Sequence, residues 1–109
     1  MTWEEFLWHM ERRLGMYVGR PRYERAFSAL TGFDLARGQG ELAAFQAWMS
    51  SRHHGSPLAF SSLVLAETFG EGASEDRLVT DADHLRAVSN LCELFREFLE
   101  QQASTVHQH

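Results

Sequence analysis

A long amphipathic stretch at residues 80–102 places the strongest constraint on how this 109-residue chain can fold. On a helical wheel its apolar side chains occupy one half of the helix, and its charged and polar side chains occupy the other. The apolar half consists of Leu85, Ala87, Val88, Leu91, Cys92, Leu94, Phe95, Phe98 and Leu99. A helix of about 30 Å with so wide an apolar face can pack against two neighbouring helices at once.

Four shorter segments with helical patterns precede this stretch and can cover it. The predicted helices begin near residues 3, 21, 41 and 57. The first, third and fourth end near residues 13, 51 and 69, and the second either stops at Gly32 or continues toward Gly38. Thr2 and Glu5 have the spacing of a capping box at the start of the first helix, and Gly70 stops the last of the four. Residues 63–65 could equally form a short buried strand, but no second strand is available to pair with it, so a helix is favoured.

These patterns predict an all-α fold. We expect a single compact domain of about five helices, residues 1–102, packed around the long C-terminal amphipathic helix. A flexible polar tail is expected at residues 103–109.

Three side chains in the helical patterns need a structural explanation. Trp48 lies on the inward stripe of its helix and is expected in the core. If the second helix continues through Gly32, Asp34 faces inward and needs a hydrogen bond; if Gly32 interrupts it, Asp34 caps a further turn. Glu67 is the single charge of an apolar helix and needs a donor, which we expect from an arginine of the connector at residues 14–22.

The connector, LGMYVGRPR, links the first two predicted helices. Two glycines bracket its apolar triplet and Pro21 bars a continuous helix through Arg20, so we predict an extended or turn segment that packs on the core. Arginines surround it at positions 12, 13, 20, 22 and 25. The spacing is not that of a phosphate-binding P-loop, and we interpret the arginines as a basic rim that pairs with acidic helices.

Charge is distributed unevenly along the chain, whose net charge is −5. Six acidic residues accompany seven arginines in residues 1–66, whereas nine acidic residues accompany three arginines in residues 67–109, and there is no lysine. Nucleic-acid binding normally depends on Lys and Arg that neutralise phosphates, so nucleic acid is not an expected partner. A basic protein surface is a better match.

The candidate partner-binding residues are acids that crowd the entry to the long helix, together with one aromatic residue. They are Trp8, Glu71, Glu75, Asp76, Asp81 and Asp83. Trp8 projects away from the apolar stripe of the first helix, near Arg12 at the i+4 position. The alternatives are a solvated loop with ordinary helix capping for the acids, and for Trp8 a contact within the domain or a single exposed position.

No catalytic residue, metal site or cofactor is predicted. The chain lacks the G-x-S-x-G and H-E-x-x-H motifs, and Cys92 lies on the apolar face of its helix. His53 and His54 are adjacent, so their side chains diverge, and no acid or cysteine follows at ligand spacing. We therefore do not expect an enzyme.

The single cysteine and the start of the chain bear on localisation. One cysteine cannot form an intramolecular disulfide, so a reducing cytoplasm is the expected setting. Glu4 and Glu5 interrupt the first apolar pattern, and no uncharged run is long enough for a signal peptide or a membrane span.

Several short motifs are spread over most of the chain: Met16-Tyr17-Val18-Gly19, Gly32-Phe33-Asp34, Phe45-x-x-Trp48 with Arg52, and Leu94-Phe95 with Glu97-Phe98-Leu99. Together they resemble the motifs of a family of small bacterial proteins found at polymorphic-toxin loci. This resemblance implies an immunity protein that binds a cognate protein toxin as a monomer in a heterodimer, and the acidity of the chain matches a toxin with a basic active site. The alternatives are a helical adaptor or regulatory module, and a nucleotide-binding enzyme that uses the arginines between residues 12 and 25.

Overall fold

The computed structural model describes residues 1–18 and 22–107, and the side chains of residues 1–12 and 22–104. Within these residues the structure consists of helices and contains no strand. The elements are α1 (Trp3–Val18), α2 (Tyr23–Arg37), α3 (Glu41–Arg52), α4 (Phe60–Phe69), the short 3-10 helix η1 (Glu75–Arg77) and α5 (Asp81–His107). The predicted all-α class is confirmed, and residues 63–65 belong to a helix.

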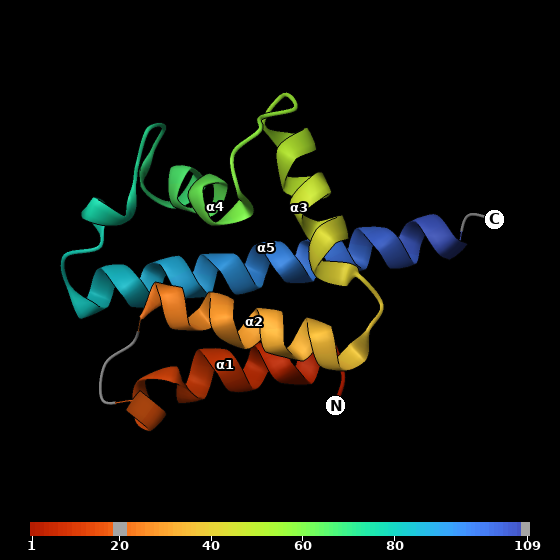
Figure 1. Cartoon of the computed structure of the whole chain (residues 1–109), viewed down its shortest axis with the longest axis horizontal. Coiled ribbons are helices and arrows are strands. Elements are labelled where there is room, and N and C mark those ends of the chain that lie inside the picture. The colour runs from red at the N-terminus through yellow and green to blue at the C-terminus, as the bar shows by residue number, and fades with distance from the viewer. Residues whose placement is uncertain (19–21, 108–109) are drawn as a thin grey trace.

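Helix α5 lies between two pairs of helices (Figure 1). Helices α1 and α2 lie on one side of it and helices α3 and α4 on the other, and all four contact it. The arrangement follows from the width of the apolar face of α5, which is too broad for one neighbour to cover.

Aromatic rings connect the two pairs of helices through α5. The Phe95 ring of α5 lies 4.6 Å from the ring of Trp3 in α1 and 4.6 Å from the ring of Phe45 in α3, measured between centroids. The predicted apolar face of α5 is buried, except for Leu99, which is half-buried, and Leu85 near its start, which is 46% exposed. Phe95 therefore occupies the centre of the core.

Helix α1 is longer than predicted. The capping box is present, because the Glu5 amide donates to the Thr2 hydroxyl at 3.1 Å and the Thr2 amide donates to the Glu5 carboxylate at 3.3 Å. The helix then continues to Val18, so the predicted extended connector is wrong for residues 14–18. A glycine inside a helix costs only about 1 kcal/mol relative to alanine, which neighbouring helical residues can offset. Residues 19–21 lie outside the described part of the chain.

Asp34 connects two helices. Helix α2 continues through Gly32 to Arg37, and the Asp34 carboxylate accepts a hydrogen bond of 3.1 Å from the Leu42 amide in the first turn of α3. That amide has no acceptor within its own helix, so the carboxylate satisfies it. Of the two possibilities for Asp34, the continuous helix is observed, and the residue has a structural role.

The sequence predicts that Trp48 lies in the core, but in the structure it lies at the edge of the core. It is half-buried, and its indole Nε1 donates a hydrogen bond of 3.0 Å to the Gln101 side chain of α5. Phe45 and Met49, on the same side of α3, fill the core instead. An indole has one polar atom that needs a partner, which favours a position at the edge of the core.

Helix α4 begins later than predicted, and α5 ends later. Pro57 does not start α4, which begins at Phe60, because the Gln46 side chain fixes the preceding residues: its amide nitrogen donates to the Leu58 carbonyl and its oxygen accepts from the Phe60 amide. Helix α5 continues to His107, through most of the residues predicted as a polar tail.

Candidate functional site

The predicted acidic residues lie in and next to the loop that joins α4 to α5. Residues 70–80 form this loop, which contains η1 and which we call the acidic loop. The Glu71, Glu75, Asp76 and Asp81 side chains are exposed, and none forms an ion pair with another described side chain. The structure therefore brings four of the six candidate partner-binding residues to one solvent-exposed region.

Asp83 has a different position from the other acids. Its carboxylate accepts hydrogen bonds of 3.1 Å from the backbone amides of Val79 and Thr80, and its own amide donates to the Thr80 hydroxyl at 3.1 Å. The hydrogen bonds from Thr80 and Val79, with a smaller contribution from nearby Arg77, lower the pKa of the Asp83 carboxyl below its usual value. Asp83 thus caps α5 and holds the end of the acidic loop.

Trp8 is separate from these acids. It is 47% exposed on α1, where the Arg12 guanidinium lies 4.7 Å from its ring centroid and the His9 ring lies 5.0 Å away. A cation that stacks on an exposed indole in this way contributes about 0.5–1 kcal/mol. The described contacts of the Trp8 ring are within α1, and the structure does not join it to the acidic loop.

The predicted basic rim is described only in part. Arg12 contacts Trp8, Arg22 lies 3.6 Å from the Glu24 carboxylate, and Arg25 is exposed. The side chains of Arg13 and Arg20 are outside the described residues. The interpretation of this segment as a rim paired with acidic helices therefore stays a prediction for those two arginines.

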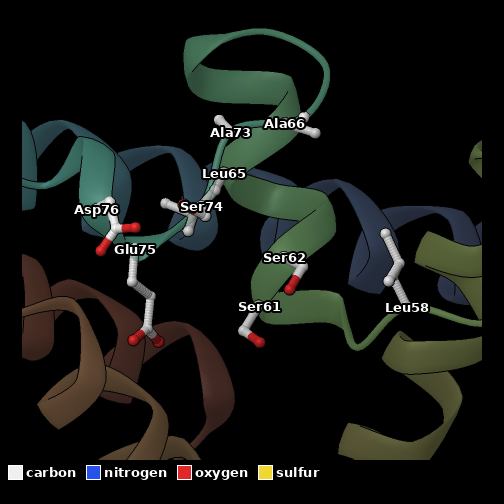
Figure 2. A pocket seen from close by; sticks show the side chains of 10 residues that line it. Leu58, Ser61, Ser62, Leu65, Ala66, Ala73, Ser74, Glu75 and Asp76 are labelled. Carbon is white, nitrogen blue, oxygen red and sulfur yellow. The ribbon is translucent and has the colours of Figure 1, made fainter.

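A pocket of about 470 Å³ lies between α4 and the acidic loop (Figure 2). Its apolar lining comes from Leu58, Leu65, Ala66 and Ala73. Its polar lining comes from three serines and two acids: Ser61, Ser62, Ser74, Glu75 and Asp76. Sequence reasoning did not identify this pocket, because it forms where α4 faces a loop that follows later in the chain.

Glu75 also influences a buried tyrosine next to the pocket. The Tyr23 hydroxyl donates a 2.7 Å hydrogen bond to the Ser61 carbonyl, and the Tyr23 side chain is fully buried. Burial raises the pKa of the Tyr23 phenol, and the negative charge of Glu75 raises it further. Tyr23 thus stays a neutral donor that joins α2 to the start of α4.

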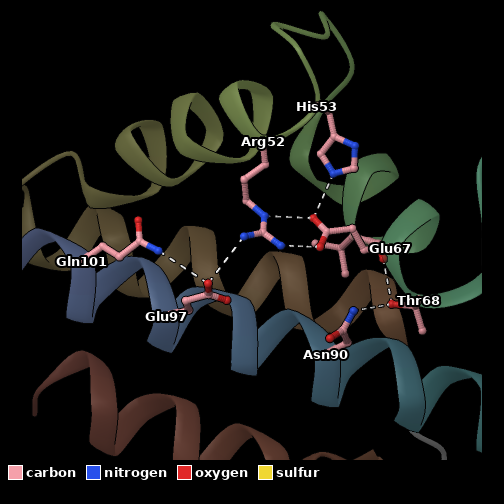
Figure 3. Close-up of polar contacts among 8 residues, drawn as sticks. Arg52, His53, Glu67, Thr68, Asn90, Glu97 and Gln101 are labelled. Carbon is pink, nitrogen blue, oxygen red and sulfur yellow. Dashed lines mark hydrogen bonds and ion pairs between the residues drawn. The ribbon is translucent and has the colours of Figure 1, made fainter.

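Glu67 is paired differently from the prediction. Its carboxylate accepts 2.7 Å and 3.3 Å hydrogen bonds from Arg52 and lies 2.9 Å from Nε2 of His53 (Figure 3). A further oxygen, on Glu97 of α5, lies 3.5 Å from the same guanidinium. Partial burial raises the pKa of Glu67, but the hydrogen bonds from Arg52 and His53 outweigh it and the pKa is lowered. The donor comes from the end of α3 and not from the connector.

The remaining features considered in the sequence are the cysteine, a metal site and a membrane span. Cys92 is fully buried, and burial raises the pKa of its thiol to about 12. Among the described residues, no group of three or more His, Cys, Asp or Glu side chains is arranged to hold a metal ion. Within that same part of the chain, no helix has the length and hydropathy needed to cross a membrane.

The chain matches no known family model, no curated protein and no solved structure at a significant level. The geometry of its own residues is therefore the basis for a functional proposal.

Proposed function

We propose that this protein is an immunity protein that binds a cognate bacterial toxin and occludes the active site of that toxin. The observation that carries the proposal is that Glu71, Glu75 and Asp76 in the acidic loop, and Asp81 next to it, are exposed and have no ion-pair partner among the described side chains. The short motifs named above also support it.

The charges of the acidic loop match a basic target. Toxins that act on nucleic acids or nucleotides use basic sites, because those sites must attract phosphate groups. A negative loop with unpaired carboxylates attracts such a site over a distance and raises the rate of association. An interface of standard size, about 800 Å² on each partner, would cover an active site completely.

The proposal requires no catalytic residue and no cofactor in this protein. Neutralisation by occlusion is stoichiometric, so a stable surface of suitable charge is sufficient. The partner is expected to be one protein toxin, bound in a one-to-one complex in the bacterial cytoplasm.

Co-expression with the product of the gene immediately upstream tests the proposed function. That product should be toxic when expressed alone, and growth should be restored when this protein is expressed with it. The two proteins should then co-purify in a one-to-one ratio. A product that is harmless, or that remains toxic in the presence of this protein, would contradict the proposal.

A further inference from the structure

The pocket between α4 and the acidic loop combines an apolar floor with acceptor groups. Ala66 and Ala73 provide accessible apolar surface next to the buried Leu65, and Glu75 and Asp76 lie at the side formed by the acidic loop (Figure 2). No described residue that lines the pocket carries a positive charge. An occupant with an apolar stem and a cationic end would match both halves of this lining.

The polar atoms of the pocket have free acceptor capacity. The Ser61, Ser62 and Ser74 hydroxyls form no hydrogen bond with another described residue, and the Glu75 and Asp76 carboxylates form no ion pair with one. An ionised carboxylate accepts hydrogen bonds and cannot donate them, and the exposed Glu75 and Asp76 can exchange water for donor groups of an occupant. The lining thus favours an occupant with several N–H groups.

Arginine fits this lining better than lysine. Its guanidinium has five N–H donors in a fixed planar arrangement and can bind a carboxylate through two of them at once. A lysine ammonium has three donors around one point and is more strongly hydrated, so it loses more on leaving water. The volume of about 470 Å³ is within the range of sites that enclose small ligands, so a single long side chain can enter.

We infer that the pocket between α4 and the acidic loop binds an arginine side chain of the partner protein. The guanidinium lies against Glu75 and Asp76, and the aliphatic stem lies on Ala66 and Ala73. The inference rests on the proposed function for the identity of the partner, the basic toxin, and not for the binding chemistry. It narrows the interaction surface from a charged loop to one defined contact.

Titration of the intact protein with N-acetyl-arginine N-methylamide tests the binding chemistry directly. Backbone amide signals in NMR spectra should shift in a saturable manner at Ser62, Gly72, Ala73 and Ser74. The matched ligand control is N-acetyl-citrulline N-methylamide, which keeps the shape of the side chain and removes its charge. Its apparent affinity should be about tenfold weaker, because charge-assisted hydrogen bonds are replaced by neutral ones.

A pair of protein variants localises the effect. The variant Glu75→Gln with Asp76→Asn should lose about tenfold in affinity for the arginine probe. The control variant Glu93→Gln with Glu100→Gln removes two exposed charges of α5 that do not line the pocket, and it should bind the probe as the parent protein does. Equal losses in both variants, equal binding of the two probes, or shifts confined to other residues would each overturn the inference.

The same variants separate this inference from the proposed function. If the parent protein neutralises the upstream gene product and the Glu75→Gln, Asp76→Asn variant neutralises it equally well, the pocket is not the contact and the immunity function stands. If the parent protein fails to neutralise that product, the proposed function is wrong, and the probe titration still decides whether the pocket binds arginine.

Discussion

The junction of α3, α4 and α5 and the acidic loop both contain acidic side chains, and they differ in how those charges are balanced. At the junction, Glu67 is bound by Arg52 and His53, and Arg52 also approaches Glu97. In the acidic loop, Glu71 and Glu75 have no such partner among the described residues. The paired carboxylate contributes to the stability of the fold, whereas the unpaired carboxylates are available to another molecule.

The largest expected loss of stability comes from a change in the core and not from a change in either charged region. Phe95→Ala should lower the free energy of unfolding by about 3–5 kcal/mol, because it leaves a cavity where α1, α3 and α5 meet. Urea denaturation followed by circular dichroism measures this loss. A loss below about 1 kcal/mol would mean that the rings do not form the centre of the core.

A smaller effect is expected at the junction. The charged hydrogen bonds between Arg52 and Glu67 should have a coupling energy of about 1 kcal/mol, which is reduced from the value for buried groups because Arg52 is 34% exposed. A double-mutant cycle of Arg52→Ala and Glu67→Gln, followed by urea denaturation, measures the coupling. Coupling indistinguishable from zero would show that this charge pair is no more stabilising than a surface contact.

The pH dependence of stability sharpens the contrast between paired and unpaired carboxylates. The pKa of Glu67 is lower in the folded protein than the ordinary value of about 4.3, so its contribution is complete above that pH and is lost as the pH falls through the lowered pKa. Glu67→Gln should therefore flatten the decrease in melting temperature below about pH 4.3. Glu71→Gln should leave that decrease unchanged, and equal effects of both variants would contradict the assignment.

The smallest effect on stability is expected in the acidic loop, where charge changes should affect binding more than folding. Reversal of charge at Glu71, Glu75 and Asp76 to arginine should change the free energy of unfolding by no more than about 0.5 kcal/mol, because these side chains are exposed. The same variant should associate more slowly with the proposed toxin partner, with a weaker dependence on salt.

Stopped-flow association kinetics at several salt concentrations measure this effect of the acidic loop. The control reverses the exposed residues Glu4, Glu93 and Glu100, which changes the net charge equally. If the association rate falls by the same factor in both variants, the acidic loop has no special role in association.

The helical class and the central position of α5 could be predicted from the sequence because periodicity specifies which face of a helix is buried. Periodicity does not specify what covers that face or where a polar edge falls. The half-buried position of Trp48 depends on Gln101, which is 53 residues away in the chain. The pairing of Glu67 with Arg52 likewise depends on how α3 and α4 approach each other.

The candidate site was predictable to a similar degree. The clustering of Glu71, Glu75 and Asp76 is visible in the sequence, because the three lie in one short loop. The capping role of Asp83 was also accessible, since Thr80 and Asp83 have the spacing of a capping pair. The pocket could not be predicted from the sequence, because it forms where α4 faces a loop whose path depends on the whole fold.

The cap at the start of α5 also affects how a partner would be bound. Asp83 holds the amides of Val79 and Thr80, so the acidic loop is anchored at the residue where it joins the longest helix. Ordering a free segment on binding costs conformational entropy that must be subtracted from the affinity. A loop that is already anchored has fewer conformations to lose on binding. The segment that carries Glu75 and Asp76 is therefore partly ordered before a partner binds.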